Sequence, residues 1–575
     1  MLALQSAHSP RFKILVAASA LFLIILLLHL TAQKDTWSIP GISLSPYKSH
    51  DDQEEDAPLT KEPAYDDDLP IFVPPPSLAT VSSDYSTGVT PSEPAQDAPS
   101  PDFPSDVSSQ EPSPDGESPP DNKNAPPESS PTTSPAVHVQ SSQSLPANYL
   151  PVSLHNEWCE NAYSTKYLYE LASTPKQMCA SGTSSLECFS VRPFERLDSF
   201  CVAKNVAVDQ AGKKFLADCS MSDATKAEFQ EFPEYMWWTG VRKMIDDWFL
   251  LSSNQKEDES TTATVKAATL QCKADDKRRS DRSTAVLFKR EGSNPNMWHS
   301  LMEVYSYYQS MDALHLATDS SGEPYFDPSQ DSKDFQVIWV DDRPRGLYAP
   351  LWNIFSSRPA IFLDDIDASR SCYDRVIIPL PGGANTMWAG DWEVRECTNS
   401  TMLDAFQRRV LSYLEVPEPA KDRPFTVTFI DRKQTRVLHD GHAFIDKLRK
   451  QYPNIHFQTF DLREGALADH LRIARETDLL VGTHGAGLTS TMFLPPRSSV
   501  VEVLPPGFMH KGFRNMANMM GHRYFSAHAT LKEGDDPKEW QKAPFLYIEE
   551  ERFMAMMDMA IASLRNSGRR NVDVV

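Results

Sequence analysis

A glycine-rich turn between Gly482 and Gly487 has the residue types that can bind a phosphate group. The apolar run Leu479–Val481 before it predicts a buried parallel strand, and residues 488–494 predict a short helix that ends at two prolines. Where a glycine turn leads into a helix, free backbone N–H groups converge and the backbone can approach an anion closely. The turn is therefore a candidate phosphate site, and the alternative is an ordinary strand-to-helix turn of an α/β protein.

Basic side chains follow another predicted strand, at residues 425–430. Arg432 follows the strand end after Asp431, with Lys433 and Arg436 just beyond it. A guanidinium beside a helix N-terminus would hold a diphosphate through two parallel hydrogen bonds. The alternative is a solvated basic turn.

Two more ionisable residues, His484 and Glu502, belong to the stretch around the glycine turn. His484 could bind a phosphate or a sugar hydroxyl, or it could only cap the helix. Glu502 lies inside the predicted strand 499–504. It either points inward with a partner, or faces a cleft where a ribose hydroxyl is a reasonable ligand, or is a surface charge on an edge strand.

A second group of reactive residues precedes this region. His299 begins a predicted helix, and an imidazole facing a cleft can act as a general base if a carboxylate is its partner. The segment Leu380–Trp392 is a glycine-rich aromatic loop of the kind that covers a substrate. Acidic pairs at 341–342 and 365–367 could hold a divalent metal on a nucleotide sugar. Such pairs are common in loops, and a metal is possible but not favoured.

Elements that alternate between strand and helix must position these residues. In the C-terminal part we expect strands at 425–430, 455–460, 479–481, 499–504 and 522–525, and helices at 438–451, 466–477 and 512–520. This alternation predicts a doubly wound parallel sheet, in which ligands bind at the carboxyl ends of the strands. A last amphipathic helix at 545–564 is expected to pack back across the two halves.

The preceding part of the chain, 151–420, predicts a second α/β domain with a cysteine-rich cap. Its expected strands are 285–288, 336–340, 359–363 and 375–380, and its expected helices are 241–251 and 298–311.

The N-terminus predicts a membrane anchor. Residues 14–32 form an apolar run of 19 with a single histidine, long enough to cross a bilayer. Arg11 and Lys13 precede it, so the positive-inside rule places residues 1–13 in the cytosol and the rest across the membrane. A signal peptide cleaved before Gln33 is the alternative, although its cleavage site would be weak.

Residues 33–150 predict an extended, disordered stem. From residue 35 to 150 the chain holds 22 of its 45 prolines, and 20 acidic against 3 basic side chains. Proline-rich, self-repelling sequence of this type does not build a core. Most of the net charge of −23 therefore belongs to the stem, and no basic stripe indicates a nucleic-acid partner.

The eight cysteines all follow the predicted anchor, and none forms a CxxC pair. An even number in an oxidising compartment favours disulfides over zinc or thiol catalysis. Cys372 and Cys397 flank one continuous segment and are the expected bridge, with the other six pairings open. A glycosylation sequon at Asn399 fits a lumenal face.

Several ordered motifs resemble the glycosyltransferase 61 family. The run Val481–Thr489 is similar to the HGAGLT signature of that family, Phe429–Arg436 to its strand-then-arginine motif, and Asn296–His299 to its N-x-(Y/W)-H motif. The segments CYDRVIIPLPGG and HKGFRNMANMMGHRYFSAHA resemble the branch that contains the EGF-domain-specific O-linked N-acetylglucosamine transferases. The resemblance runs from about residue 186 to 530.

The resemblance implies a GT-B architecture, with two Rossmann-like domains facing a cleft, and inverting transfer from a UDP-sugar. The nucleotide-sugar domain would be 421–544, followed by a C-terminal helix and tail at 545–575. Glu502 would contact the nucleoside side and His299 the acceptor side, with Asp391 and Glu393 as rival general bases to His299. The residues that would hold the donor diphosphate are Arg432, Arg436, His484, Gly485, Ala486, Gly487, Leu488 and Thr489.

By the same resemblance, UDP-GlcNAc is the expected donor and a protein or glycan hydroxyl the acceptor. Animal members of the branch are soluble and carry a C-terminal ER-retrieval tetrapeptide, whereas this chain ends in Asn571–Val575 and has the predicted anchor. We therefore expect a single-pass type II membrane protein of the Golgi, or the ER, with a lumenal catalytic domain. The alternatives are a UDP-xylose-dependent transferase of the same family, a non-catalytic lumenal glycan-binding or scaffold protein, and a nicotinamide-dependent oxidoreductase. The last would need G-x-G-x-x-G, and the glycines here have another order.

Overall fold

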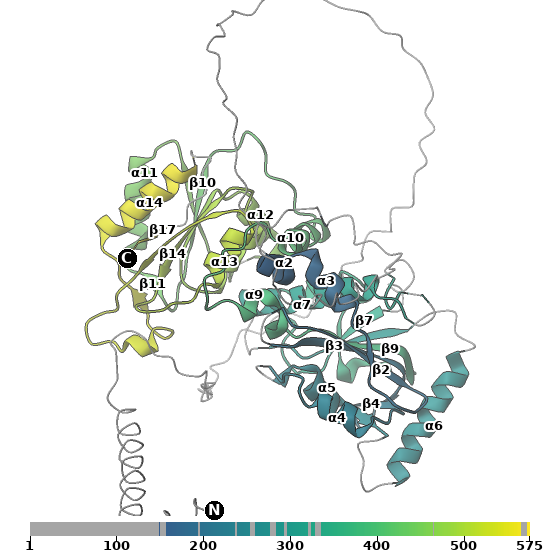
Figure 1. Ribbon diagram of the computed structural model, residues 1–575. Helices are drawn as coiled ribbons and strands as arrows, with labels where there is room; N and C mark the ends of the chain where they lie inside the picture. Colours follow the sequence, from purple (N-terminus) through teal and green to yellow (C-terminus); the bar gives the residue numbers. More distant parts are fainter. Residues whose placement is uncertain are drawn as a thin grey trace, which may run out of the picture. The chain divides into compact units, whose positions relative to one another are not determined.

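A computed structural model gives the structure of the chain (Figure 1). It describes residue 149, residues 572–574, and residues 157–564 apart from 194–195, 236–237, 253–258, 277–282, 292–295, 320–321, 323, 328–334, 368 and 464. The predicted membrane segment and, apart from Tyr149, the predicted stem lie outside the described residues. Among the helices that are described, none combines the length and the apolar character needed to cross a membrane.

The C-terminal half contains a parallel sheet of six strands in the order β12-β10-β13-β14-β15-β17. The strands are β10 Thr426–Ile430, β12 His456–Phe460, β13 Leu479–Thr483, β14 Ser499–Leu504, β15 Arg523–His528 and β17 Val572–Val574. The predicted parallel sheet is confirmed, and β17 is a strand that the sequence did not indicate. Strand β14 lies inside the sheet, so Glu502 is not a surface charge on an edge strand.

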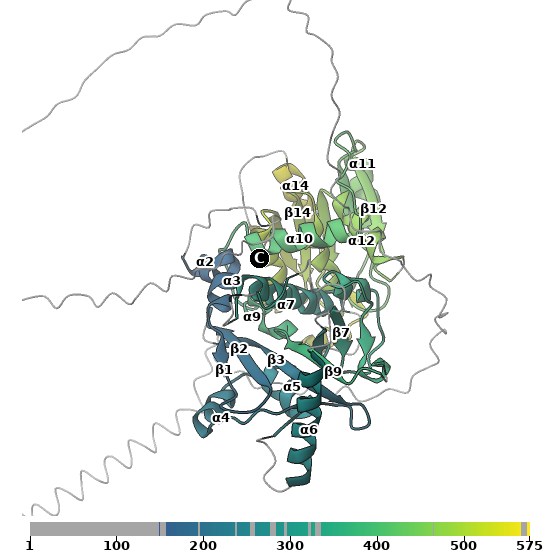
Figure 2. The ribbon, with the colours of Figure 1, turned by 90° about the vertical axis from the view of Figure 1, so that its right-hand side faces the viewer.

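Helices cover both faces of this sheet (Figures 1 and 2). On one face, α11 (Gly441–Gln451) and α14 (Glu550–Leu564) pack on side chains such as Val481 and Val501. On the other face, the neighbouring side chains of β13 and β14 pack against three elements. These are α12 Leu467–Arg475, the 3₁₀ helix η7 Ala486–Phe493 and α13 Gly512–Met519.

The expectation that the last helix packs across both halves is wrong. Residues Phe545–Leu546 form a short strand, β16, which pairs with β11 (Val437–Leu438). Helix α14 then begins at Glu550, and its buried side chains, such as Phe553 and Met556, join only the core of the C-terminal sheet. The apolar stripe of α14 fits the open face of that sheet, which explains the difference.

The N-terminal half contains a mixed sheet of nine strands. Strands β9, β6, β7 and β8 are parallel, while β1, β2, β3 and β9 pair in antiparallel fashion, and β4 and β5 extend β3. The strands are β1 Lys176–Gln177, β2 Ser185–Val191, β3 Asp198–Asp209, β4 Lys214–Ala217, β5 Phe249–Leu251, β6 Thr284–Phe288, β7 Phe335–Trp339, β8 Ile361–Phe362 and β9 Cys372–Ile378. The strands predicted from residue 285 to 380 are confirmed, whereas the helix predicted at 241–251 ends at Trp248 and continues as β5.

Helix α7 (Met297–Leu316) is the central helix of this half, with 17 of its 20 residues buried. It shares one apolar core with η7 and α13 of the other half and with α3 (Thr165–Ala172) and α10 (Thr401–Tyr413). The Gln407 side chain of α10 donates a hydrogen bond of 2.6 Å to the carbonyl oxygen of Met492. The other helices described here are α2 Glu157–Tyr163, α4 Asp223–Phe229, α5 Val241–Trp248, α6 Glu259–Asp276 and α9 Thr386–Ala389.

The eight cysteines form four disulfides, but the expected Cys372–Cys397 bridge is wrong. Cys372 in β9 pairs with Cys272 of α6, and Cys397 pairs with Cys159 of α2. The other two bridges are Cys179–Cys219 and Cys188–Cys201. The sheet and its covering helices bring together cysteines that are 100 and 238 residues apart in the chain, and sequence neighbourhood cannot show this.

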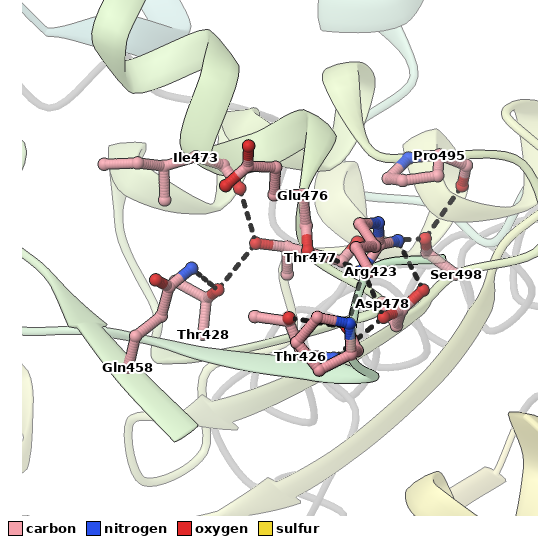
Figure 3. Close-up of polar contacts among 11 residues, drawn as sticks. Arg423, Thr426, Thr428, Gln458, Ile473, Glu476, Thr477, Asp478, Pro495 and Ser498 are labelled. Carbon is pink, nitrogen blue, oxygen red and sulfur yellow. Dashed lines mark hydrogen bonds and ion pairs between the residues drawn. The ribbon is translucent and has the colours of Figure 1, made fainter. Parts of the chain in front are cut away.

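Polar contacts secure the amino ends of the C-terminal strands (Figure 3). The Asp478 carboxylate accepts two hydrogen bonds of 2.7 Å from the Arg423 guanidinium and one of 2.8 Å from the backbone N–H of Thr426. Nearby, the hydroxyls of Thr428 and Thr477 lie 2.6 Å apart, which ties β10 to the residues before β13. These bonds hold in register the two strands whose opposite ends lead to Arg432 and His484.

We expect Asp478→Asn to lower the free energy of unfolding by about 1–3 kcal/mol, because it removes charge-assisted hydrogen bonds from a largely buried guanidinium. Chemical denaturation followed by circular dichroism measures the change. Asp469→Asn is the matched control, since Asp469 pairs with Arg472 on the exposed side of α12 and its loss should leave the midpoint almost unchanged. Equal midpoints for the two variants would contradict the prediction.

Candidate functional site

The carboxyl ends of β10 and β13 bring the predicted arginines to the glycine turn. A Cβ atom on Gly485 would lie 2.3 Å from Nη1 of Arg432 and 3.6 Å from Nη1 of Arg436. Only a residue without a side chain therefore allows both guanidinium groups to approach the turn as they do. The Thr483 hydroxyl donates a hydrogen bond of 2.7 Å to the carbonyl oxygen of Arg436, which fixes the loop against β13.

The two guanidinium groups have hydrogen-bond partners but no counter-charge among the described residues. Arg432 donates from Nε to the carbonyl oxygen of Thr435 (2.8 Å), and Arg436 donates from Nη1 to that of His484 (3.2 Å). Both are half-buried, and burial lowers the pKa of Arg432. Burial and then the Arg432 charge lower the pKa of Arg436 to about 10. Two desolvated cations side by side favour a bound anion.

His484 and Glu502 form a buried pair beside this cationic site. Nδ1 of His484 lies 2.6 Å from one carboxylate oxygen of Glu502, and the Tyr524 hydroxyl donates a hydrogen bond of 2.5 Å to the other. Burial lowers the pKa of His484, whereas the hydrogen bond and the charge of Glu502 raise it. In the neutral imidazole, Nδ1 is then the donor to Glu502 and Nε2 is the acceptor.

An aromatic cluster surrounds the His484 ring. Ring centroids of Phe508, His510, Phe513 and Trp540 lie 4.6, 5.2, 5.5 and 5.7 Å from that of His484. Trp540 also lies under the Arg436 guanidinium, 5.3 Å from it. These rings limit the water around the imidazole and the guanidinium, which strengthens their electrostatic interactions with a charged ligand.

The remaining residues of the glycine turn belong to η7. Ala486 begins this 3₁₀ helix, and Gly487, Leu488 and Thr489 are buried within it. A Cβ atom on Gly487 would meet the Leu462 side chain at 2.6 Å, so this glycine is required for packing. Leu488 belongs to the core shared with α7, which means that its side chain supports the turn from within the protein.

Asp391 and Glu393 lie in the loop between α9 and α10, and their environments differ. The Asp391 carboxylate lies 3.1 Å from Nε2 of His510, and its carbonyl oxygen accepts a hydrogen bond of 2.6 Å from the backbone N–H of Lys511. Glu393 forms an ion pair of 2.5 Å with Arg395, and its side chain is 68% exposed. Asp391 thus joins the aromatic cluster around His484, and Glu393 faces solvent.

His299 is placed at the start of α7, next to the aromatic loop. Its ring centroid lies 4.6 Å from that of Trp388. Burial, with a smaller effect of the Arg343 charge, lowers the pKa of His299 to about 4. The preceding residue, Trp298, contacts the rings of His510 and Phe513, so the first turn of α7 adjoins the cluster around His484.

Two buried acids near His299 were not indicated by the sequence. Glu303 lies one helical turn after His299, and its carboxylate accepts a hydrogen bond from the backbone N–H of Glu291. Thr239 donates a hydrogen bond of 2.8 Å to the Glu291 carboxylate. A glutamate in a helix or after a strand is too common in sequences to indicate a functional site. These two glutamates differ from others because both are buried next to each other.

The acidic pairs considered for a metal have other partners. Asp341 forms a buried ion pair of 2.7 Å with Arg290, and Asp367 accepts hydrogen bonds from Ser369. Within the part of the chain that the structure describes, no cluster of three or more metal-ligating side chains occurs. Asn399 precedes the N-cap residue Ser400 of α10, and its glycosylation stays a prediction.

A family model matches a part of the chain that contains residues of this site, and several known proteins are similar to the chain. Residues 383–501 match the family model described as Glycosyltransferase 61. The chain is similar to the EGF domain-specific O-linked N-acetylglucosamine transferases of Drosophila melanogaster (24% identical over 284 residues, 47% of this chain and 48% of the relative) and Pan troglodytes (26% over 223 residues, 38% and 40%). The similarity to the Bos taurus protein is 27% over 202 residues, 34% of this chain and 38% of the relative. The chain thus spans about half the length, or less, of these relatives.

We expect Glu502→Gln to lower the pKa of His484 further, because the Glu502 charge and hydrogen bond both raise it. The neutral imidazole would then persist to lower pH. NMR titration of the His484 ring measures the shift, and Tyr524→Phe, which keeps the carboxylate charge, is the control that should move the pKa far less. An unchanged pKa in Glu502→Gln would show that the carboxylate does not control the imidazole.

Proposed function

Because residues 383–501 match the family model described as Glycosyltransferase 61, we propose that the chain is an inverting glycosyltransferase that transfers a sugar from a UDP-sugar to a protein or glycan hydroxyl. The observation that carries the proposal is the pair of half-buried guanidinium groups beside Gly485, Arg432 and Arg436, which have no counter-charge in the part of the chain that the structure describes. A diphosphate supplies the negative charge and the oxygen acceptors that such a pair requires.

In this proposal the reaction is a single displacement. The acceptor oxygen forms its bond to the anomeric carbon as the bond to the diphosphate oxygen breaks. Arg432, Arg436 and the N–H groups of the glycine turn stabilise the negative charge that develops on UDP. His484 faces the same charge, and the nearby Glu502 carboxylate favours its protonation when the diphosphate is present.

We propose GlcNAc as the sugar and a protein hydroxyl as the first acceptor to test. Both come from the names of the relatives, which are O-linked N-acetylglucosamine transferases specific for EGF domains. An EGF-like domain is therefore the first acceptor for an assay. UDP-xylose is the alternative donor, and a non-catalytic glycan-binding protein is the alternative function.

We further propose a GT-B arrangement, with the donor on the C-terminal sheet and the acceptor on the N-terminal half, in a lumenal domain of a type II Golgi membrane protein. Four disulfides favour an oxidising compartment. The apolar run at 14–32 favours the anchor. Protease protection of sealed membrane vesicles tests the topology, since digestion of the catalytic domain from the cytosolic side would exclude it.

Titration of the purified protein with UDP-GlcNAc, UDP-xylose and NADH, combined with an assay for UDP release, tests the function. We expect saturable binding of UDP-GlcNAc and release of UDP, with weaker binding of UDP-xylose. Stronger use of UDP-xylose would make the chain a xylosyltransferase, and binding without turnover on any acceptor would favour the scaffold. Binding of NADH alone would reject the transferase.

We expect Arg432→Ala and Arg436→Ala each to weaken UDP binding by about 10- to 100-fold, the loss of one charged hydrogen-bonding group. Isothermal titration calorimetry measures the dissociation constants. Arg472→Ala is the matched control, because Arg472 is exposed on α12 and paired with Asp469. An unchanged affinity in both site variants would place the diphosphate elsewhere.

A further inference from the structure

A pair of buried carboxyl groups lies beneath the glycine loop of the N-terminal half. Glu291 follows the carboxyl end of β6, and Glu303 lies on α7; they are 4% and 2% exposed. A Cβ atom on Gly382 would lie 3.1 Å from Oε2 of Glu291 and 2.9 Å from Cγ of Glu303. The loop can cover the two acids closely only because it is built from glycine at this point.

The two oxygens of Glu291 differ in their partners. Oε1 accepts hydrogen bonds from the Thr239 hydroxyl (2.8 Å) and from the backbone N–H of Gly383 (3.3 Å). Oε2 is buried and has no hydrogen-bond partner within the described residues. A buried carboxylate oxygen without a donor is costly for folding, which makes it a candidate to act on a ligand proton.

The acids adjoin the acceptor side of the proposed site. The Gly382 Cβ position lies 3.2 Å from the ring of Trp388, and this ring contacts that of His299. The residue before His299, Trp298, reaches His510 and Phe513 of the cluster around His484. A continuous set of side chains therefore leads from the cationic site to Glu291.

The three residues considered so far as general bases are less suited to the task. The His299 imidazole has a pKa of about 4, so it is a weak base at neutral pH. Asp391 is engaged by His510, and Glu393 is exposed and paired with Arg395. None of them offers a buried carboxylate oxygen that is free to accept a proton.

We propose that Glu291 is the general base of the transfer and that Glu303 is a positioning residue beside it; this rests on the proposed function. As the acceptor oxygen bonds to the anomeric carbon, its proton passes to Oε2 of Glu291. The bond from the anomeric carbon to the diphosphate breaks, and its electron pair leaves on UDP. Glu291 later releases the proton to solvent, so the step needs no further reactant.

The charges around the two acids agree with Glu291 as the base and Glu303 as the positioning residue. Burial raises the pKa of Glu291, and burial together with the Glu291 charge raises that of Glu303. Glu303 therefore stays protonated while Glu291 ionises first. The other charged or titratable groups that interact with the pair electrostatically are Arg196, Tyr235, Arg290, Asp341 and Arg343. His299 lies one helical turn before Glu303 on α7.

The test compares Glu291→Gln with Glu303→Gln. We expect Glu291→Gln to lower kcat by about 10²- to 10⁴-fold, the usual contribution of a general base, with UDP affinity unchanged. Activity of the wild-type protein should fall as pH is lowered through a pKa shifted toward neutrality, and this limb should be absent in Glu291→Gln. Glu303→Gln keeps a neutral hydrogen-bonding side chain beside the base, so it should lower kcat far less than Glu291→Gln does and should keep the pH limb.

UDP release from UDP-GlcNAc over a pH series, with calorimetry of UDP binding, gives these quantities for the full-length protein. Full activity of a folded Glu291→Gln, or loss confined to Glu303→Gln, would overturn the assignment of the base. His299→Ala should retain the pH limb. If the limb were lost in this variant, the His299 imidazole would be the general base instead of Glu291. A wild-type protein that binds UDP but never releases it from a UDP-sugar would instead overturn the proposed function itself.

Discussion

Helix α7 is enclosed by protein along almost its whole length, and the position of the functional residues depends on this burial. Its side chains share one core with α3, α10, η7 and α13. Because a packed interior does not deform continuously, the first turn of α7 is held at a fixed place beside the glycine turn. Trp298 meets the aromatic cluster there, while His299 and Glu303 face the glycine loop. One helix thereby connects the two groups of ionisable residues.

Burial acts in opposite directions on these two groups. It destabilises the charged forms of Arg432 and Arg436, so a bound diphosphate relieves part of the cost of their desolvation. It also destabilises the carboxylates of Glu291 and Glu303, which retain protons to higher pH. In the proposed mechanism, burial therefore favours the binding of negative charge by the arginines and the uptake of a proton by the glutamates. Both effects would disappear if the residues lay on an open surface.

Much of the C-terminal half follows from its sequence, because local pattern and tertiary structure agree there. Alternating apolar runs and helices predicted the parallel sheet, and β14 spans the residues expected for it. The glycines and basic residues after the predicted strands indicated that Arg432 and His484 lie together at the carboxyl ends of the strands, as they do. The Cys272–Cys372 bridge and strand β17 were missed, since pairing across long stretches of chain leaves no local signal. The partner of Glu502 was left open for the same reason, because Tyr524 lies on the next strand.

The buried acids of the N-terminal half could not be predicted from the sequence. His299 is conspicuous in the sequence because it follows an N-cap residue and a tryptophan, whereas Glu291 and Glu303 resemble any other glutamates. What distinguishes them is that β6, α7 and the loop at Gly382 converge, and this convergence is a property of the mixed sheet. A histidine with its pKa lowered by burial can orient an acceptor as a neutral hydrogen-bonding group. The carboxyl pair behind it can then exchange the proton, so that binding and proton transfer are assigned to different side chains of one cluster.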